Sequence, residues 1–161
     1  MSVERYRRDQ RAKEHAGEPL GCGLDERPGP TRGRATIGEL RIVKPAQVGD
    51  ESGLQVVFVV HAEELGAAKL VVETTLHEQG RGPLRTGVAR LADTQGWLNV
   101  FEVVTPPDDG HFCRECSAFV PFAALEPEHA GTLRCFARVR LLEAERGTLA
   151  EEEVAFELQA G

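Results

Sequence analysis

The chain has 161 residues, of which 41% are hydrophobic, 28% charged and only 6% aromatic. This composition supplies one modest core and excludes a wholly disordered chain. The formal net charge of -7 argues against general nucleic-acid binding, and no apolar run approaches the roughly 20 residues that cross a bilayer. The charged N-terminus lacks the apolar stretch of a secretory signal, so we expect a cytoplasmic protein.

Residues 1–35 differ in composition from the rest of the chain. Basic residues outnumber acidic ones there by two, so the segment carries +2 and the remaining 126 residues carry -9. Prolines and glycines are concentrated between residues 19 and 33, with few apolar side chains to offset the cost of ordering them. We therefore predict a flexible, disordered N-terminal arm over 1–35 and a folded domain over 36–161. The arm is either a docking element for a partner or a solvated extension.

Apolar and polar residues alternate through most of the chain after residue 36. Alternation places one set of side chains on a core and the other toward solvent, and the many valines and threonines favour such half-buried strands. Turn residues separate the runs at short intervals. The predicted strands are 37–43, 54–62, 69–77, 85–91, 97–104, 112–120, 132–142 and 150–158. This pattern indicates an all-β fold, an antiparallel β-sandwich of about eight strands.

Three segments allow a second interpretation. Residues 132–142 also fit an apolar helical stripe, but as a strand they place Arg134, Arg138 and Arg140 outward, opposite Glu153 and Glu157 of the next strand. We favour the strand. Residues 63–68 are either one helical turn or a broad loop, and residues 123–125 are predicted to form a short helix between strands.

The segment Phe119-Val120-Pro121-Phe122, followed by a short connector, Gly131 and a long strand, resembles the late part of C2-like β-sandwich domains. The resemblance covers 37–158 in outline and implies a sandwich of C2-like or immunoglobulin-like type. It also implies membrane docking, often through calcium, or protein binding. Calcium would need a cluster of loop acids, and the candidates are Asp50, Glu51, Asp93, Asp108 and Asp109. Because Asp108 and Asp109 are the only paired aspartates among these candidates and Asp is common in turns, the sequence disfavours a membrane partner.

The most suggestive local motif is the run from His111 to Cys116. Cys113 and Cys116 are spaced as a Cys-x2-Cys pair, and with His111 and Cys135 they could complete a Cys3His zinc site. Residues three apart on a strand point to opposite faces, so only a bulge would bring both sulfurs together. The alternative is that the cysteines pack as small apolar side chains. Without a secretory signal, we expect reduced cysteines rather than disulfides.

Catalytic motifs are weak in this sequence. Neither a nucleophile elbow nor a glycine-rich phosphate loop is present. His61 and His77 share the outward parity at the ends of successive strands, so they either approach each other or are separate surface histidines. Trp97 shares a face with Phe101 and Val103, and we favour a core aromatic over an exposed anchor for a partner.

These observations together predict a non-enzymatic cytoplasmic protein-interaction module of β-sandwich type, with no cofactor and no nucleic acid. The expected partner is another protein, and the apolar residues Val57, Val59 and Val71 on the outward parity also allow a homo-oligomer through an edge strand. One alternative is a zinc-binding module through His111, Cys113, Cys116 and Cys135. The other is a C2-like membrane-docking domain.

Overall fold

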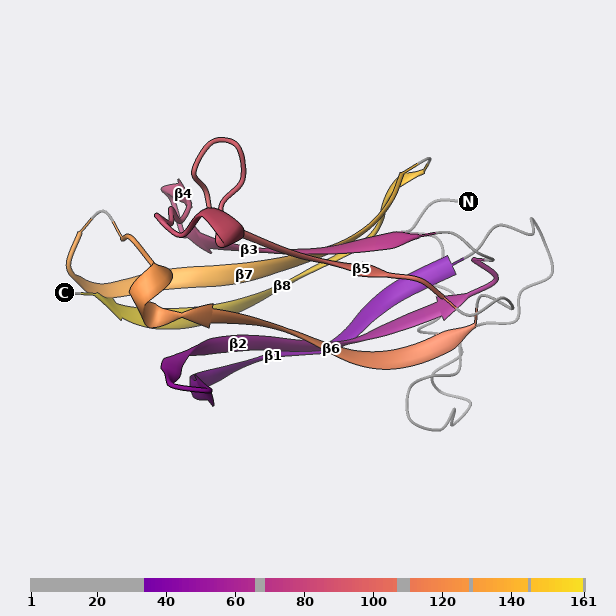
Figure 1. Ribbon diagram of the computed structural model, residues 1–161, viewed down its shortest axis with the longest axis horizontal. Coiled ribbons are helices and arrows are strands. Elements are labelled where there is room, and N and C mark those ends of the chain that lie inside the picture. The colour runs from indigo at the N-terminus through magenta and orange to yellow at the C-terminus, as the bar shows by residue number, and fades with distance from the viewer. Residues whose placement is uncertain (1–33, 66–68, 107–110, 128, 145, 161) are drawn as a thin grey trace.

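In a computed structural model, two antiparallel sheets stack face to face and form the predicted β-sandwich (Figure 1). The structure describes residues 34–65, 69–106, 111–127, 129–144 and 146–160. The three-stranded sheet has the order β1-β2-β6, with β1 at Arg34–Val48, β2 at Glu51–Glu63 and β6 at Phe112–Pro121. The predicted arm lies outside the described residues except for its last two positions, which begin β1.

The five-stranded sheet has β3 and β7 at its centre. Its order is β4-β3-β7-β8. One edge of β3 pairs with β7, and the other edge pairs with both β4 and β5, which follow each other along it. These strands span Leu70–Glu78 (β3), Gly82–Pro83 (β4), Asn99–Val104 (β5), Gly131–Glu143 (β7) and Gly147–Ala160 (β8). None of the helices in the described part of the chain has the length and apolarity needed to cross a membrane.

Every predicted strand is present except 85–91, which is wrong. The Thr86 hydroxyl accepts a hydrogen bond from the backbone N–H of Val88 at 3.1 Å, and Ala89–Leu91 forms a 3-10 helix, η2. At Gly87 an added Cβ would lie 2.5 Å from a carboxylate oxygen of Glu126, so a larger residue would require the Glu126 side chain to move. Leu91 is nevertheless buried. Burial of Leu91 and isolated β-bridges from Arg85 to Trp97 and Glu126, rather than a continuous strand, therefore hold this segment.

The ambiguous segment at 132–142 is a strand, β7, which pairs with both β3 and β8. The predicted charge pairing across β7 and β8 is confirmed at Arg138, which faces Glu153 with 2.8 Å between Nε and Oε2. The short helix predicted at 123–125 is confirmed as the 3-10 helix η3 at Phe122–Ala124. Part of the segment 63–68 lies outside the described residues.

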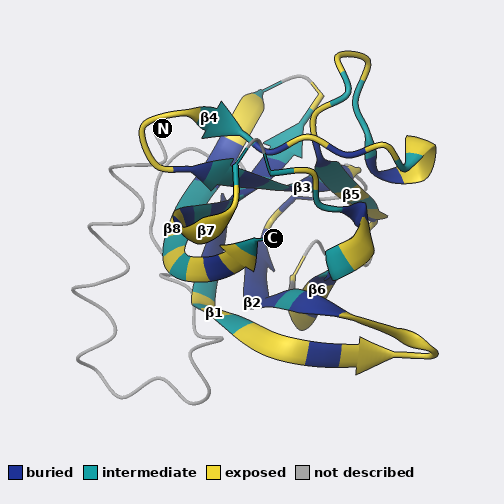
Figure 2. Cartoon of the chain, turned by 90° about the vertical axis from the view of Figure 1, so that its left-hand side faces the viewer, coloured by how far each residue is buried: buried dark blue, intermediate teal, exposed yellow. Residues whose placement is uncertain are grey.

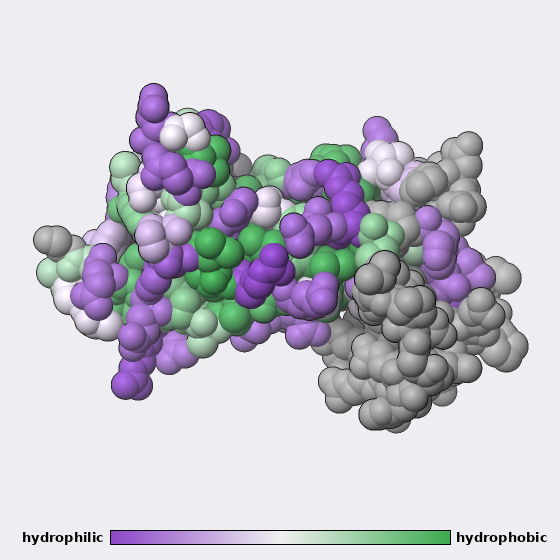
Figure 3. Space-filling view, turned by 90° about the horizontal axis from the view of Figure 1, so that it is seen from below, coloured by the Kyte–Doolittle hydropathy of each residue, from purple (hydrophilic) through white to green (hydrophobic). Residues whose placement is uncertain are grey.

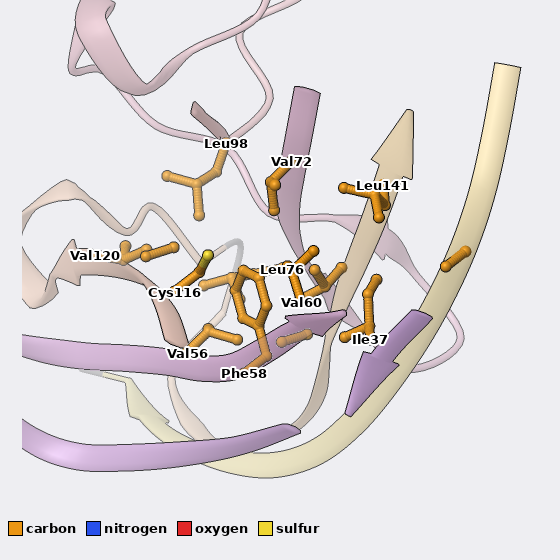
Figure 4. Packing of buried hydrophobic residues seen from close by; sticks show 14 of the residues in the cluster. Ile37, Val56, Phe58, Val60, Val72, Leu76, Leu98, Cys116, Val120 and Leu141 are labelled. Carbon is orange, nitrogen blue, oxygen red and sulfur yellow. The ribbon is translucent and has the colours of Figure 1, made fainter. Parts of the chain in front are cut away.

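The core lies between the sheets and is built from the inward side chains of both. Figure 2 shows buried residues where the two layers face each other and a mostly exposed β1–β2 hairpin end. Phe58 is the largest side chain in this core and is 1% exposed. Figure 4 shows its ring between the sheets, with Val56, Val60 and Cys116 beside it. Burial of this kind supplies the main stabilising free energy of such a domain.

Strand β2 is buried on both faces. Its outward valines Val57 and Val59 are only 5% and 7% exposed. Arg41 of β1 and Glu115 of β6 form an ion pair of 3.5 Å across them, since Arg41 is opposite Val57 and Glu115 is opposite Val59. The stem of an arginine covers apolar surface in this way. Figure 3 views the molecule from the side of this sheet, where hydrophobic and hydrophilic side chains interleave.

Candidate functional site: the outer stripe and free edge of strand β5

The structure separates the residues predicted as zinc ligands. Cys113 lies opposite His61 on the outward parity of β6, whereas Cys116 faces the core and Cys135 lies in the other sheet. The β2–β6 ladder runs without a register shift, so no bulge brings Cys113 and Cys116 together. Across the described segments, no group of three or more His, Cys, Asp or Glu side chains is placed to hold a metal ion. Zinc binding through this set, including His111, stays a prediction that the arrangement does not favour.

The three cysteines of the sandwich differ in their chemistry. Cys113 is disulfide-bonded, so the expectation of reduced cysteines does not hold there. Cys116 and Cys135 are free thiols in the core, where small apolar packing was the alternative prediction. Burial raises the pKa of Cys116, and burial together with the nearby Glu78 raises the pKa of Cys135 to about 11. Both thiols are therefore protonated at neutral pH and poorly suited as nucleophiles or ligands.

His61 and His77 do not approach each other, because β2 and β3 belong to different sheets. His77 stacks on Phe136 of β7, with ring centroids 4.8 Å apart and planes within 5°. Burial, and to a lesser degree the guanidinium of Arg138, lowers the pKa of His77. The idea of a paired histidine site is therefore wrong. The alternative of separate surface histidines is right that the two are separate, but His61 is buried, at 5% exposed.

The acids considered for calcium have turn roles where they can be described. Asp93 Oδ1 accepts hydrogen bonds from the backbone N–H groups of Gln95 at 2.8 Å and Trp97 at 3.0 Å. This is the local capping that places Asp in turns. Asp108 and Asp109 lie outside the described residues, so calcium-dependent membrane docking stays a prediction.

A buried acid that the sequence analysis missed is Glu78, at the end of β3. His129 Nε2 lies 2.6 Å from its Oε1, and Arg81 Nε lies 3.7 Å from the same oxygen. The adjoining cavity of about 20 Å³ has room for little more than a water molecule. No sequence signal marks this pair, because its members are 51 residues apart. The contact ties the β6–β7 connection to β3 and leaves no space for a substrate.

A second hollow lies between the segment after η3 and the end of β8. Its volume is about 170 Å³, it is half open, and Phe122, Leu125 and Leu158 are among its lining residues. Gln159 is its main polar contributor, so it offers no acid, base or nucleophile. Neither hollow provides the convergent groups that a reaction requires.

Strand β5 has one free edge. It pairs with β3 from Leu70 opposite Val104 to Thr75 opposite Asn99, and within the described ranges no strand pairs with its other edge. The strand lacks the proline, lysine, glycine or bulge that natural edge strands commonly use against unwanted pairing. Its backbone therefore presents donors and acceptors that can pair with a further strand.

Three large apolar side chains lie on the outward parity of β5 and the residues just before it. We call Trp97, Phe101 and Val103 the β5 stripe, and their exposed fractions are 36%, 61% and 60%. The favoured interpretation of Trp97 as a core aromatic is therefore wrong, and its alternative as an exposed anchor for a partner stays a prediction. The cross-strand neighbour of Phe101 is Glu73, whose carboxylate accepts a hydrogen bond from Asn99 Nδ2 at 3.1 Å.

The inward parity of β5 carries a single charge. Val100 and Val104 pack toward the core, whereas Glu102 accepts a hydrogen bond from Arg114 Nη2 of β6 at 2.9 Å. An inward charge at a sheet edge normally discourages pairing. Here Arg114 is paired with Glu102, which reduces the charge that would oppose the pairing of a further strand.

Comparisons with known proteins give no family for this chain. No family model matches it, and no curated protein matches it. Among solved structures, a glycosyl hydrolase family 2 member from Bacteroides cellulosilyticus DSM 14838 is 13% identical, with a TM-score of 0.49 over 76% of this chain and 15% of that one. The alkylpurine DNA glycosylase AlkC from Pseudomonas fluorescens is 13% identical, with a TM-score of 0.43 over 79% and 31% of the two chains. This chain therefore spans less than a third of either structure.

Proposed function

We propose that the chain is a non-enzymatic, cytoplasmic protein-interaction module that binds an extended segment of a partner along β5. The observation that carries the proposal is the coincidence of a free backbone edge with the β5 stripe. An added strand would gain main-chain hydrogen bonds from the edge and apolar contacts from the alternate side chains.

The stripe has the residue types that dominate binding energy at interfaces. Aromatic side chains such as Trp97 and Phe101 are enriched among the residues whose truncation costs most. Full burial of an exposed Phe or Val side chain is worth roughly 1.5–3 kcal/mol, so Phe101 and Val103 supply a substantial part of an association free energy. Large exposed apolar side chains grouped on one strand are a marker of interaction surfaces.

An affinity capture with matched variants tests the proposal. We would replace Phe101 and Val103 together by serine and compare the proteins recovered from native cells with those recovered by the wild type. The control replaces the outward Val43 of β1 by serine, since that residue is also exposed but lies in the other sheet. The proposal expects a partner lost by F101S/V103S and kept by V43S. Equal recovery by both variants would overturn it.

A further inference from the structure

We propose that the segment that pairs with the free edge of β5 is β5 of a second copy of this chain, in an antiparallel two-fold arrangement. This inference rests on the proposed function, because it names the partner of the same edge. It is carried by the order of residues along β5 and by the Arg114–Glu102 ion pair.

The residues of β5 are nearly symmetric in polarity about Glu102. Two apolar residues precede it, Val100 and Phe101, and two follow it, Val103 and Val104. Antiparallel pairing about a two-fold axis at Glu102 places Phe101 opposite the second copy's Val103 on the outer face. It places Val100 opposite Val104 on the inner face. Every apolar residue of the strand then meets an apolar residue, and aromatic–β-branched cross-strand pairs stabilise a sheet.

The neighbouring registers are less favourable. A two-fold axis at Phe101 would set Val100 against Glu102 and Asn99 against Val103. An axis at Val103 would set Glu102 against Val104 and Phe101 against Thr105. Both registers place polar side chains opposite apolar ones, so fewer apolar side chains meet an apolar neighbour than in the register centred on Glu102. The sequence of this one strand therefore selects the register centred on Glu102.

The selected register brings two Glu102 carboxylates opposite each other, which by itself is destabilising. In each copy Arg114 already donates to Glu102 at 2.9 Å, and the side chains of this pair are 51% and 43% exposed. Each Glu102 therefore keeps its own arginine partner at the axis, which offsets part of the repulsion between the two carboxylates. A two-fold contact of this kind uses the same surface on both subunits, so the free edge of β5 is paired in both copies.

Sedimentation velocity of the full chain tests the inference over roughly a hundredfold range of concentration, because a reversible dimer depends on concentration. We expect a monomer–dimer equilibrium for the wild type. Val103→Lys should be monomeric throughout, whereas the control Ala155→Lys, on the exposed outer parity of β8, should dimerise normally. Monomeric wild type, or a dimer that V103K leaves intact, would overturn the inference.

Single and double variants of the Arg114–Glu102 pair test the register centred on Glu102. Arg114→Gln leaves the two carboxylates uncompensated and should weaken the dimer roughly tenfold. The double variant Arg114→Gln/Glu102→Gln should restore it. An unchanged dimer in R114Q would contradict pairing about Glu102, and urea unfolding of each variant shows that it is folded.

Failure of this inference is distinguishable from failure of the proposed function. A monomeric wild type that still loses a foreign partner in F101S/V103S would contradict self-pairing alone. A dimer that forms through another surface, together with unchanged capture, would contradict both.

Discussion

Arg114 of β6 and Glu102 of β5 join the two sheets on the side of the sandwich where each strand has its free edge. Both side chains are about half exposed, so the pair contributes no more than about 1 kcal/mol to folding stability. Its main consequence is local: it neutralises the one charge that would otherwise oppose the pairing of a further strand with β5.

One buried and one exposed phenylalanine give the first prediction. Phe58→Ala should lower the free energy of unfolding by about 3–5 kcal/mol, because the ring is buried and a cavity would remain. Phe101→Ala should change it by less than about 0.5 kcal/mol, since the ring is mostly exposed. Urea unfolding measures both. A large loss of stability in F101A would mean that Phe101 is structural and not available to a partner.

The ion pair of Arg34 and Glu63 gives the second prediction. Arg34 Nη2 and Glu63 Oε2 are 2.5 Å apart, and the side chains are only 5% and 11% exposed. Glu63→Gln removes a carboxylate that faces the buried guanidinium of Arg34 and should lower the free energy of unfolding by clearly more than the control does. The control Glu115→Gln breaks an exposed pair and should cost less than about 1 kcal/mol. Equal losses in the two variants would contradict the burial of Arg34 and Glu63.

A third prediction concerns pH. Because the pKa of His77 in the fold is below its ordinary value of 6.5, the unfolded chain binds more protons between those two values. The free energy of unfolding should therefore fall as the pH drops from 6.5 through the folded pKa. His77→Phe preserves the stacking on Phe136 but cannot titrate, so it should flatten this part of the stability profile. Identical profiles for H77F and wild type would exclude His77 as the cause.

The strands of this fold were largely predictable because alternation is a local signal. Leu133 to Leu141 buries every second side chain, as its sequence indicates, whereas Leu54 to Val60 buries its core-facing set and also Val57 and Val59. Residues 85–91 were mispredicted because the turn at Thr86 and the contact of Gly87 with Glu126 depend on the segment after β6.

The candidate site was less predictable because it depends on which strands pair. Trp97, Phe101 and Val103 share a parity in the sequence, but alternation does not tell which of the two parities faces the core. The face that β5 turns toward the core follows from its pairing with β3 and from the hydrogen bond between Glu102 and Arg114 of the other sheet. The proximity of His61 and His77 was mispredicted for the same reason. Their strands, β2 and β3, follow each other in the sequence but lie in different sheets.

The buried thiols give a fourth prediction. Cys116 and Cys135 are free, buried and of raised pKa, so iodoacetamide at neutral pH should modify them in the unfolded protein but not in the native one. Peptide mass spectrometry after labelling separates the two sites. Rapid modification of native Cys135 would contradict its place in the core.

Metal analysis of the same preparation extends this prediction to zinc. With Cys113 and Cys116 on opposite faces of β6, we expect no stoichiometric zinc in the purified protein. One zinc per chain, lost on replacing Cys116 by serine, would revive the zinc-module alternative.

The central claim is that β5 is the docking edge, and site-specific photo-crosslinking in cells tests it most directly. A photoreactive residue at position 103 should form crosslinks to protein, either to a second copy or to another chain, whereas the same residue at position 155 on β8 should form none. Absence of protein crosslinks from position 103, or the same products from both positions, would contradict the account.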